Sequence, residues 1–139
     1  MANLVYPAGI QALTGTSRSW NLSSVRVVAC NSGYTFDDTH QTLSDIPAVN
    51  RVALSALMAG KTNTGGVHDA QNGSMSGVSE VFDKLVIYID LNTESLSPLL
   101  MHIDTVLDDQ DAEIPIAVDP TNADVTLEWN PSGIWSWIP

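Results

Sequence analysis

The side chains of this protein that are capable of catalysis or metal binding are three histidines, one cysteine and a run of carboxylates. His40, His68 and His102 lie 28 and 34 residues apart, whereas the histidine ligands of zinc sites usually come in pairs about three to five residues apart. Asp69 follows His68 directly, and Asp104 lies two residues after His102. Neither pair accompanies a nucleophile signature such as Gly-x-Ser-x-Gly. We therefore predict structural or solvated histidines, no metal site built on them and no enzymatic activity.

The acidic run Asp108-Asp109-Gln110-Asp111-Ala112-Glu113 has the chemistry of a calcium site, because hard cations prefer clustered carboxylates on a loop. An EF-hand loop that begins at Asp109 requires Gly at its sixth position and Glu at its twelfth. Ile114 and Pro120 stand there instead, so this motif is excluded. A looser ion site remains an alternative. We favour an exposed acidic loop that contacts a basic partner.

Two further features resemble functional sites but lack the residues that such sites need. Cys30 is the single cysteine, which excludes an internal disulfide, and we expect it to be a small buried hydrophobic residue. Gly60-Lys61-Thr62 resembles the end of a phosphate-binding P-loop, but Ser55 stands where that motif needs its first glycine. The sequence therefore predicts no catalytic residue and no cofactor.

The net charge is concentrated in the C-terminal part of the chain. Residues 1–84 contain six acids and five bases, whereas residues 85–139 contain ten acids and neither Lys nor Arg. The two parts therefore carry −1 and −10 of the net charge of −11. Such an excess repels polyanions and favours basic surfaces. We expect no binding to nucleic acid.

Most of the elements that must position these groups read as strands. The unbroken apolar run at 84–90 predicts a central strand that is covered on both faces, and residues 99–104 predict its antiparallel partner. Alternation over 124–130 places Val125, Leu127 and Trp129 on a buried face. We also expect strands at 25–30, 51–57, 61–68 as hairpin partner of 51–57, 114–118 and 134–138, a loop at 69–79, a short helix at 4–13, and a helical turn capped by Asp37 or Asp38 and ended by Pro47.

Seven to eight short strands with one or two short helices predict a mainly β fold, either an antiparallel β-sandwich or a partly open barrel. One domain is the default for 139 residues, so we expect residues 1–139 to form a single β-rich domain with a short N-terminal helical segment. No apolar run approaches the ~20 residues of a membrane span. The first residues lack the basic start and long apolar stretch of a signal peptide. We therefore predict no membrane contact and a protein made in a cytoplasm.

The predicted terminal segments carry apolar side chains that suit a contact surface. Trp135 and Trp137 share one face of the last predicted strand, while Ile134 and Ile138 share the other. One of these faces points outward, unless the strand lies in the middle of its sheet. The residues that we predict to bind a partner are Leu4, Val5, Tyr6, Trp135, Trp137, Asp108, Asp109, Asp111 and Glu113.

Short motifs follow one another along nearly the whole chain. They are Tyr6-Pro7-Ala8-Gly9-Ile10-Gln11-Ala12-Leu13, Tyr34-Thr35-Phe36-Asp37-Asp38-Thr39-His40, and the segments at 25–28, 43–47, 51–53, 61–62, 65–70, 85–88, 97–104 and 126–130. In this order and spacing they resemble a family of small tailed-bacteriophage structural proteins that are encoded among head and tail genes. The tryptophan-rich end at 131–137 departs from the usual pattern of that family.

The resemblance implies a virion structural protein without catalytic residues. The interpretation that we prefer is a capsid decoration (cement) protein that binds the major capsid protein lattice. A tail or head–tail adaptor component is the alternative from the same class, and a cytoplasmic ligand- or metal-binding module is the alternative from another class. The implied partners are the major capsid protein or other virion proteins, together with further copies of this chain in a homo-oligomer. The implied location is the virion, after assembly in the host cytoplasm.

Overall fold

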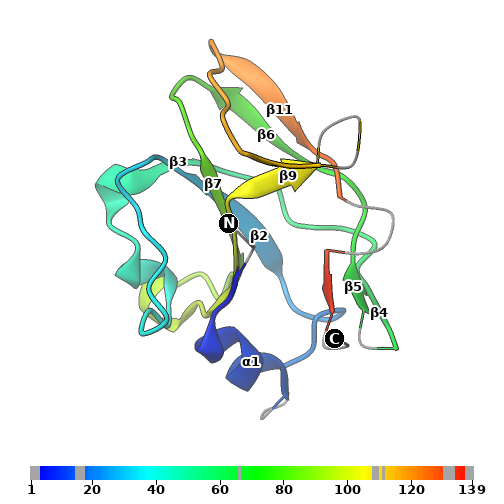
Figure 1. The fold of residues 1–139 in the computed structure, drawn as a ribbon. Coiled ribbons are helices and arrows are strands. Elements are labelled where there is room, and N and C mark those ends of the chain that lie inside the picture. Colours follow the sequence, from blue (N-terminus) through cyan, green and yellow to red (C-terminus); the bar gives the residue numbers. More distant parts are fainter. Residues whose placement is uncertain are drawn as a thin grey trace.

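A computed structural model of the chain describes residues 4–14, 18–65, 67–107, 110, 112–129 and 134–136. Over these residues the fold is mainly β, with antiparallel sheets in a sandwich-like arrangement and one α-helix (Figure 1). This confirms the predicted fold class. The described strands run from β1 to β12, which exceeds the predicted seven to eight because many of them are only two or three residues long.

The largest sheet has five strands in the order β1-β8-β7-β2-β3. These strands are β1 (Leu4–Val5), β8 (Leu99–Ile103), β7 (Lys84–Ile89), β2 (Val25–Cys30) and β3 (Arg51–Leu54). All neighbours in this sheet are antiparallel. The predicted central position of residues 84–90 and their pairing with residues 99–104 are therefore confirmed.

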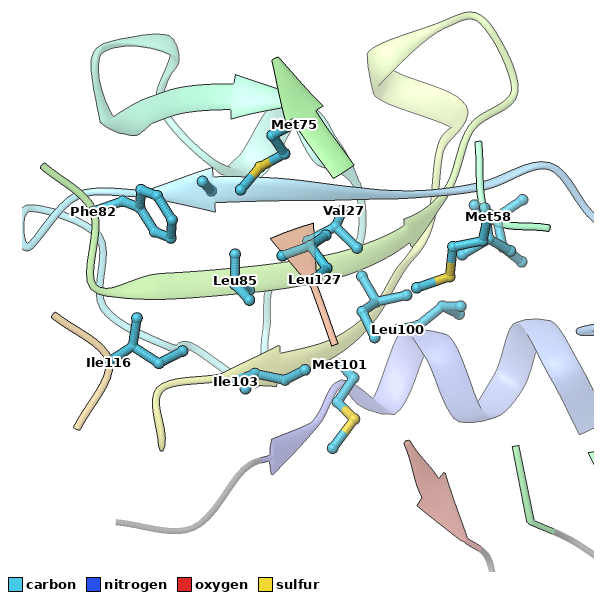
Figure 2. Close-up of a cluster of buried hydrophobic side chains, with 14 of the residues drawn as sticks. Val27, Met58, Met75, Phe82, Leu85, Leu100, Met101, Ile103, Ile116 and Leu127 are labelled. Atoms are coloured by element: carbon cyan, nitrogen blue, oxygen red, sulfur yellow. The ribbon is translucent and has the colours of Figure 1, made fainter. Parts of the chain in front are cut away.

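Both faces of β7 are buried, which explains its unbroken apolar sequence. Leu85, Ile87 and Ile89 belong to one core cluster, and Val86 and Tyr88 belong to another. Since successive side chains of a strand point to opposite faces, the sheet separates the two clusters. Figure 2 shows the first cluster, in which residues of the sheet meet residues of the other segments.

The remaining strands form three smaller sheets, all antiparallel. They pair β6 (Gly73–Val78) with β11 (Ala123–Leu127), β9 (Thr105–Leu107) with β10 (Glu113–Pro115), and β5 (Val67–Asp69) with both β4 (Thr62–Thr64) and β12 (Trp135–Ser136). Met75 and Leu127 attach the β6–β11 pair to the first cluster. Ile116 attaches the segment that follows β10 to the same cluster.

Two strand predictions were wrong. Residues 61–68 are not the hairpin partner of β3, because β4 pairs with β5 and β3 pairs with β2. Gly65, with a φ of 60°, allows the chain to reverse between β4 and β5. Residues 69–79 are not a loop, since they contain β6. Their Asn, Gly and Ser content conceals the two buried positions Met75 and Val78.

The helical predictions were partly right. The helix α1 (Pro7–Thr14) forms, but β1 precedes it and pairs with β8. Asp37 caps a hydrogen-bonded turn and not a helix, because its carboxylate accepts the Thr39 N–H at 2.8 Å and its carbonyl oxygen accepts the His40 N–H at 3.0 Å. The short 3-10 turns are η1 (Leu43–Asp45), η2 (Ala48–Asn50) and η3 (Glu94–Leu96). Asp45 sets up η1 instead, because its carboxylate accepts the backbone N–H groups of Gln41 and Thr42 at 2.8 and 3.1 Å.

Close contact between α1 and β8 depends on Gly9. A Cβ atom at Gly9 would lie 2.7 Å from the Leu100 Cα atom and 2.8 Å from the Leu99 carbonyl oxygen. Both are backbone atoms of a buried strand, so they cannot move aside as a flexible side chain would. The Tyr6 N–H donates to the Leu100 carbonyl oxygen at 2.9 Å and fixes the start of the helix at the same place.

We predict that Gly9→Ala lowers the free energy of unfolding by about 1–3 kcal/mol through overpacking. The overpacking acts against helix propensity, since Ala is more favourable than Gly in a helix interior by ~1 kcal/mol. Urea unfolding of Gly9→Ala and of the exposed control Gln11→Ala measures the difference. A Gly9→Ala protein as stable as the parent would show that α1 does not lie this close to β8.

Candidate functional site

The three histidines lie in different surroundings. His40 lies in the loop before η1, and His68 and His102 lie in β5 and β8. The His68 ring packs edge-on against Trp20, with 5.5 Å between ring centroids. Within the described ranges, no three His, Cys, Asp or Glu side chains are placed to hold a metal ion.

Two tyrosines and a histidine form a hydrogen-bonded chain that leads from the core to the surface. The Tyr6 and Tyr34 hydroxyls are 2.7 Å apart, and the Tyr34 hydroxyl lies 2.9 Å from His40 Nδ1. His40 Nε2 lies 3.9 Å from a carboxylate oxygen of Asp37. Burial raises the pKa of Tyr6, and it raises the pKa of Tyr34 to about 12. Both phenols are therefore protonated near neutral pH, and the chain ties the N-terminal segment to the loop at 34–40.

Tyr6 corrects one prediction about the N-terminal segment. We expected its side chain to contact a partner, but it is 0% exposed and belongs to the second core cluster. Its ring packs against Phe36, with 4.8 Å between centroids. The sequence did not reveal this, because the residues that cover Tyr6 come from distant segments. We therefore remove Tyr6 from the candidate contact surface.

His102 is buried between aromatic rings. Its ring centroid lies 6.1 Å from that of Tyr34 and 5.5 Å from that of Phe36. Neither ring nitrogen has a hydrogen-bond partner among the described residues. Burial lowers the pKa of His102, so its ring is uncharged near neutral pH. This side chain is part of the core.

Cys30 is fully buried, which confirms the expectation of a small hydrophobic residue at this position. Burial raises the pKa of its thiol to about 12, although Lys84 and Arg51 act in the opposite direction. Because the thiolate is the reactive form of cysteine, this thiol is unsuited to nucleophilic catalysis near neutral pH.

Several Arg and Lys side chains form salt bridges within the fold. Arg26 contacts the Asp90 carboxylate at 2.7 Å, and Arg51 contacts that of Glu94 at 2.9 Å. Lys84 contacts the carboxylate of its neighbour Asp83 at 3.1 Å. These cations are balanced by carboxylates of the same chain and leave little positive charge for the surface.

Four acids of the C-terminal part are exposed and form no salt bridge with a described residue. They are Glu113, Asp119, Asp124 and Glu128. They lie in β10, in the connection to β11, in β11 and directly after it, in the yellow to orange part of Figure 1. We call these four residues the acidic region. Since residues 85–139 contain neither Lys nor Arg, this acidic region is the candidate functional site of the protein.

The remaining predicted contact residues do not form one surface. Leu4 and Val5 are half-buried in β1, at the edge of the five-stranded sheet, whereas Trp135 pairs with His68 of another sheet. Glu113 is exposed in β10 and belongs to the acidic region. The predictions for Asp108, Asp109, Asp111 and Trp137 lie outside the described residues.

An open pocket of about 450 Å³ separates α1 from the loop before η1. Its lining consists of Pro7, Ala8, Ile10, Gln11, Asp38, Thr39 and Gln41. Sequence reasoning missed it, because the two segments that form it are distant in the chain. It contains one carboxylate, and its lining has no base, thiol or imidazole to act with that group.

No described helix has the length and apolar character needed to cross a membrane. Comparisons with protein-family models, with curated proteins and with solved structures found no match to this chain.

We predict that His102 makes stability depend on pH. Below the ordinary histidine pKa of 6.5, the unfolded chain takes up a proton that the buried ring takes up only at lower pH. The stability that depends on an uncharged His102 ring is complete above pH 6.5. It is lost as the pH falls through the lowered pKa of the folded state, and the free energy of unfolding then changes by at most about 1.4 kcal/mol per pH unit.

Replacement of His102 with Phe keeps an aromatic ring and removes the titration. Thermal unfolding of both proteins between about pH 5 and 7.5 avoids the range in which carboxylates titrate. We expect the parent to lose stability toward the acidic end and His102→Phe to lose less. Equal pH dependence in the two proteins would refute the assignment of this titration to His102.

Proposed function

We propose that this chain is a structural protein of a bacteriophage virion, namely a capsid decoration protein that binds the major capsid protein lattice. The observation that carries the proposal is the acidic region, whose four carboxylates are exposed and have no cationic partner in the described residues. A basic protein surface is its natural complement, because opposite potentials accelerate association and exclude wrong partners.

The positions of the Tyr, His and Cys side chains that could act in catalysis favour a structural role for them. Tyr6, Tyr34 and His40 are joined to one another by hydrogen bonds, and both phenols lie in the core. Cys30 and His102 are buried among apolar and aromatic neighbours. Their positions stabilise the fold and do not converge on a space where a substrate would react.

The resemblance to tailed-bacteriophage structural proteins gives the proposal its assembly and its partner. A small catalytically silent protein that is present in many copies suits the symmetric surface of a capsid. A tail or head–tail adaptor protein is the alternative from the same class. It differs from the proposed function in location and in copy number, which an image of the particle distinguishes.

The direct test mixes the purified protein with heads that lack it and images the product by electron cryomicroscopy. We expect density that repeats regularly over the whole shell. Density confined to the tail or to the portal vertex would favour the adaptor alternative. Heads without added density would contradict both assignments.

We further predict that the association rate with these heads falls by about tenfold between low and physiological ionic strength. Glu128→Gln removes one charge from the acidic region and should slow association. Asp38→Asn removes one charge from the loop before η1 and should leave the rate almost unchanged. Surface plasmon resonance with immobilised heads measures both rates. Equal effects of the two variants would show that net charge alone, and not the acidic region, drives association.

A further inference from the structure

The ribbon of β9 and β10, two strands that pair with each other, exposes apolar side chains. Val106 lies opposite Ile114, and Leu107 lies opposite Glu113. Val106 and Ile114 are 44% and 41% exposed and share one face of the ribbon. Leu107 is 45% exposed on the other face. In the described part of the chain no third strand joins this pair.

The base of the ribbon is anchored, although its outer part is not covered. Thr105 and Ile116 are both buried at this base, and the Ile116 N–H donates to the Asp104 carbonyl oxygen at 2.9 Å. Beyond it, Phe82 and Val118 exchange two backbone hydrogen bonds of 3.1 Å. A two-stranded ribbon is marginal by itself, so these anchors hold the exposed face in a fixed position.

We propose that the β9–β10 ribbon docks this protein on its partner, with Val106 and Ile114 entering an apolar slot that Lys or Arg side chains border. This inference rests on the proposed function and specifies how the protein would bind the capsid protein. The pair supplies apolar area at the centre of the contact. Glu113 points to the opposite face of the ribbon, next to Leu107, and its exposed carboxylate adds negative charge beside the slot.

Charge complementarity selects a basic partner over a second copy of this chain. Glu113 has no salt bridge with a described residue, and residues 85–139 contain ten acids and no Lys or Arg. A second copy would carry the same net charge of −11. Juxtaposed like charges oppose association, whereas a slot bordered by cations is attracted.

Two other exposed apolar residues, Val49 and Leu96, lack this combination. Val49 in η2 and Leu96 in η3 are more exposed, at 81% and 62%, but they stand on separate 3-10 turns. The nearest charges along the chain, Arg51 and Glu94, already neutralise each other at 2.9 Å. Val49 and Leu96 are therefore the appropriate control positions.

The test compares Val106→Thr/Ile114→Thr with Val49→Thr/Leu96→Thr in binding to heads that lack the protein. Thr keeps the β-branched shape and places a hydroxyl where the slot would be apolar, so we expect about tenfold weaker binding for the ribbon variant. The control variant should bind like the parent. Circular dichroism and thermal unfolding establish that both variants fold. Glu113→Lys is the second ribbon variant, for which we expect slower association.

The outcomes separate this inference from the proposed function. If both ribbon variants bind heads as tightly as the parent does, the inference is overturned and the capsid assignment stays in place. A parent that does not bind heads would overturn both. Sedimentation of the free proteins tests whether a second copy of this chain binds the ribbon instead. If Val106→Thr/Ile114→Thr dissociates an oligomer of the parent, the ribbon is an interface between copies and the inference is wrong.

Discussion

The burial of β7 on both faces determines how the other segments of this protein pack. Leu85, Ile87 and Ile89 require cover on one side, and Val86 and Tyr88 require it on the other. Met75 of β6 and Leu127 of β11 provide part of the first cover, and Tyr6 and Tyr34 provide part of the second. The hydrogen-bonded chain from Tyr6 to His40 follows from this arrangement, because buried hydroxyls need partners.

The same arrangement determines where charge is exposed. Arg26, Arg51 and Lys84 lie on the strands of the large sheet and form salt bridges with carboxylates beside them. The strands β10 and β11 lie outside that sheet and carry exposed acids without bases. The fold therefore separates a nearly neutral sheet from an acidic region. We interpret this separation as the basis of docking on a larger, basic surface.

Local patterns predicted the central part of the fold, whereas long-range contacts determined the rest. Apolar runs gave β2, β7 and β8, since a strand buried on both faces is apolar throughout. Composition concealed β6, because two buried residues among Gly and Ser do not look like a strand. The excess of acid was visible in the sequence. The burial of Tyr6 was not visible, because the residues that cover it come from distant segments. The pairing of Val106 with Ile114 is local, but it was missed because residues 105–107 were not predicted to form a strand.

We propose that this protein covers a capsid in many copies. Quantitative mass spectrometry of purified virions, with the major capsid protein as internal standard, counts those copies. We expect a copy number of the same order as that of the major capsid protein. A few copies per particle, or none, would contradict it.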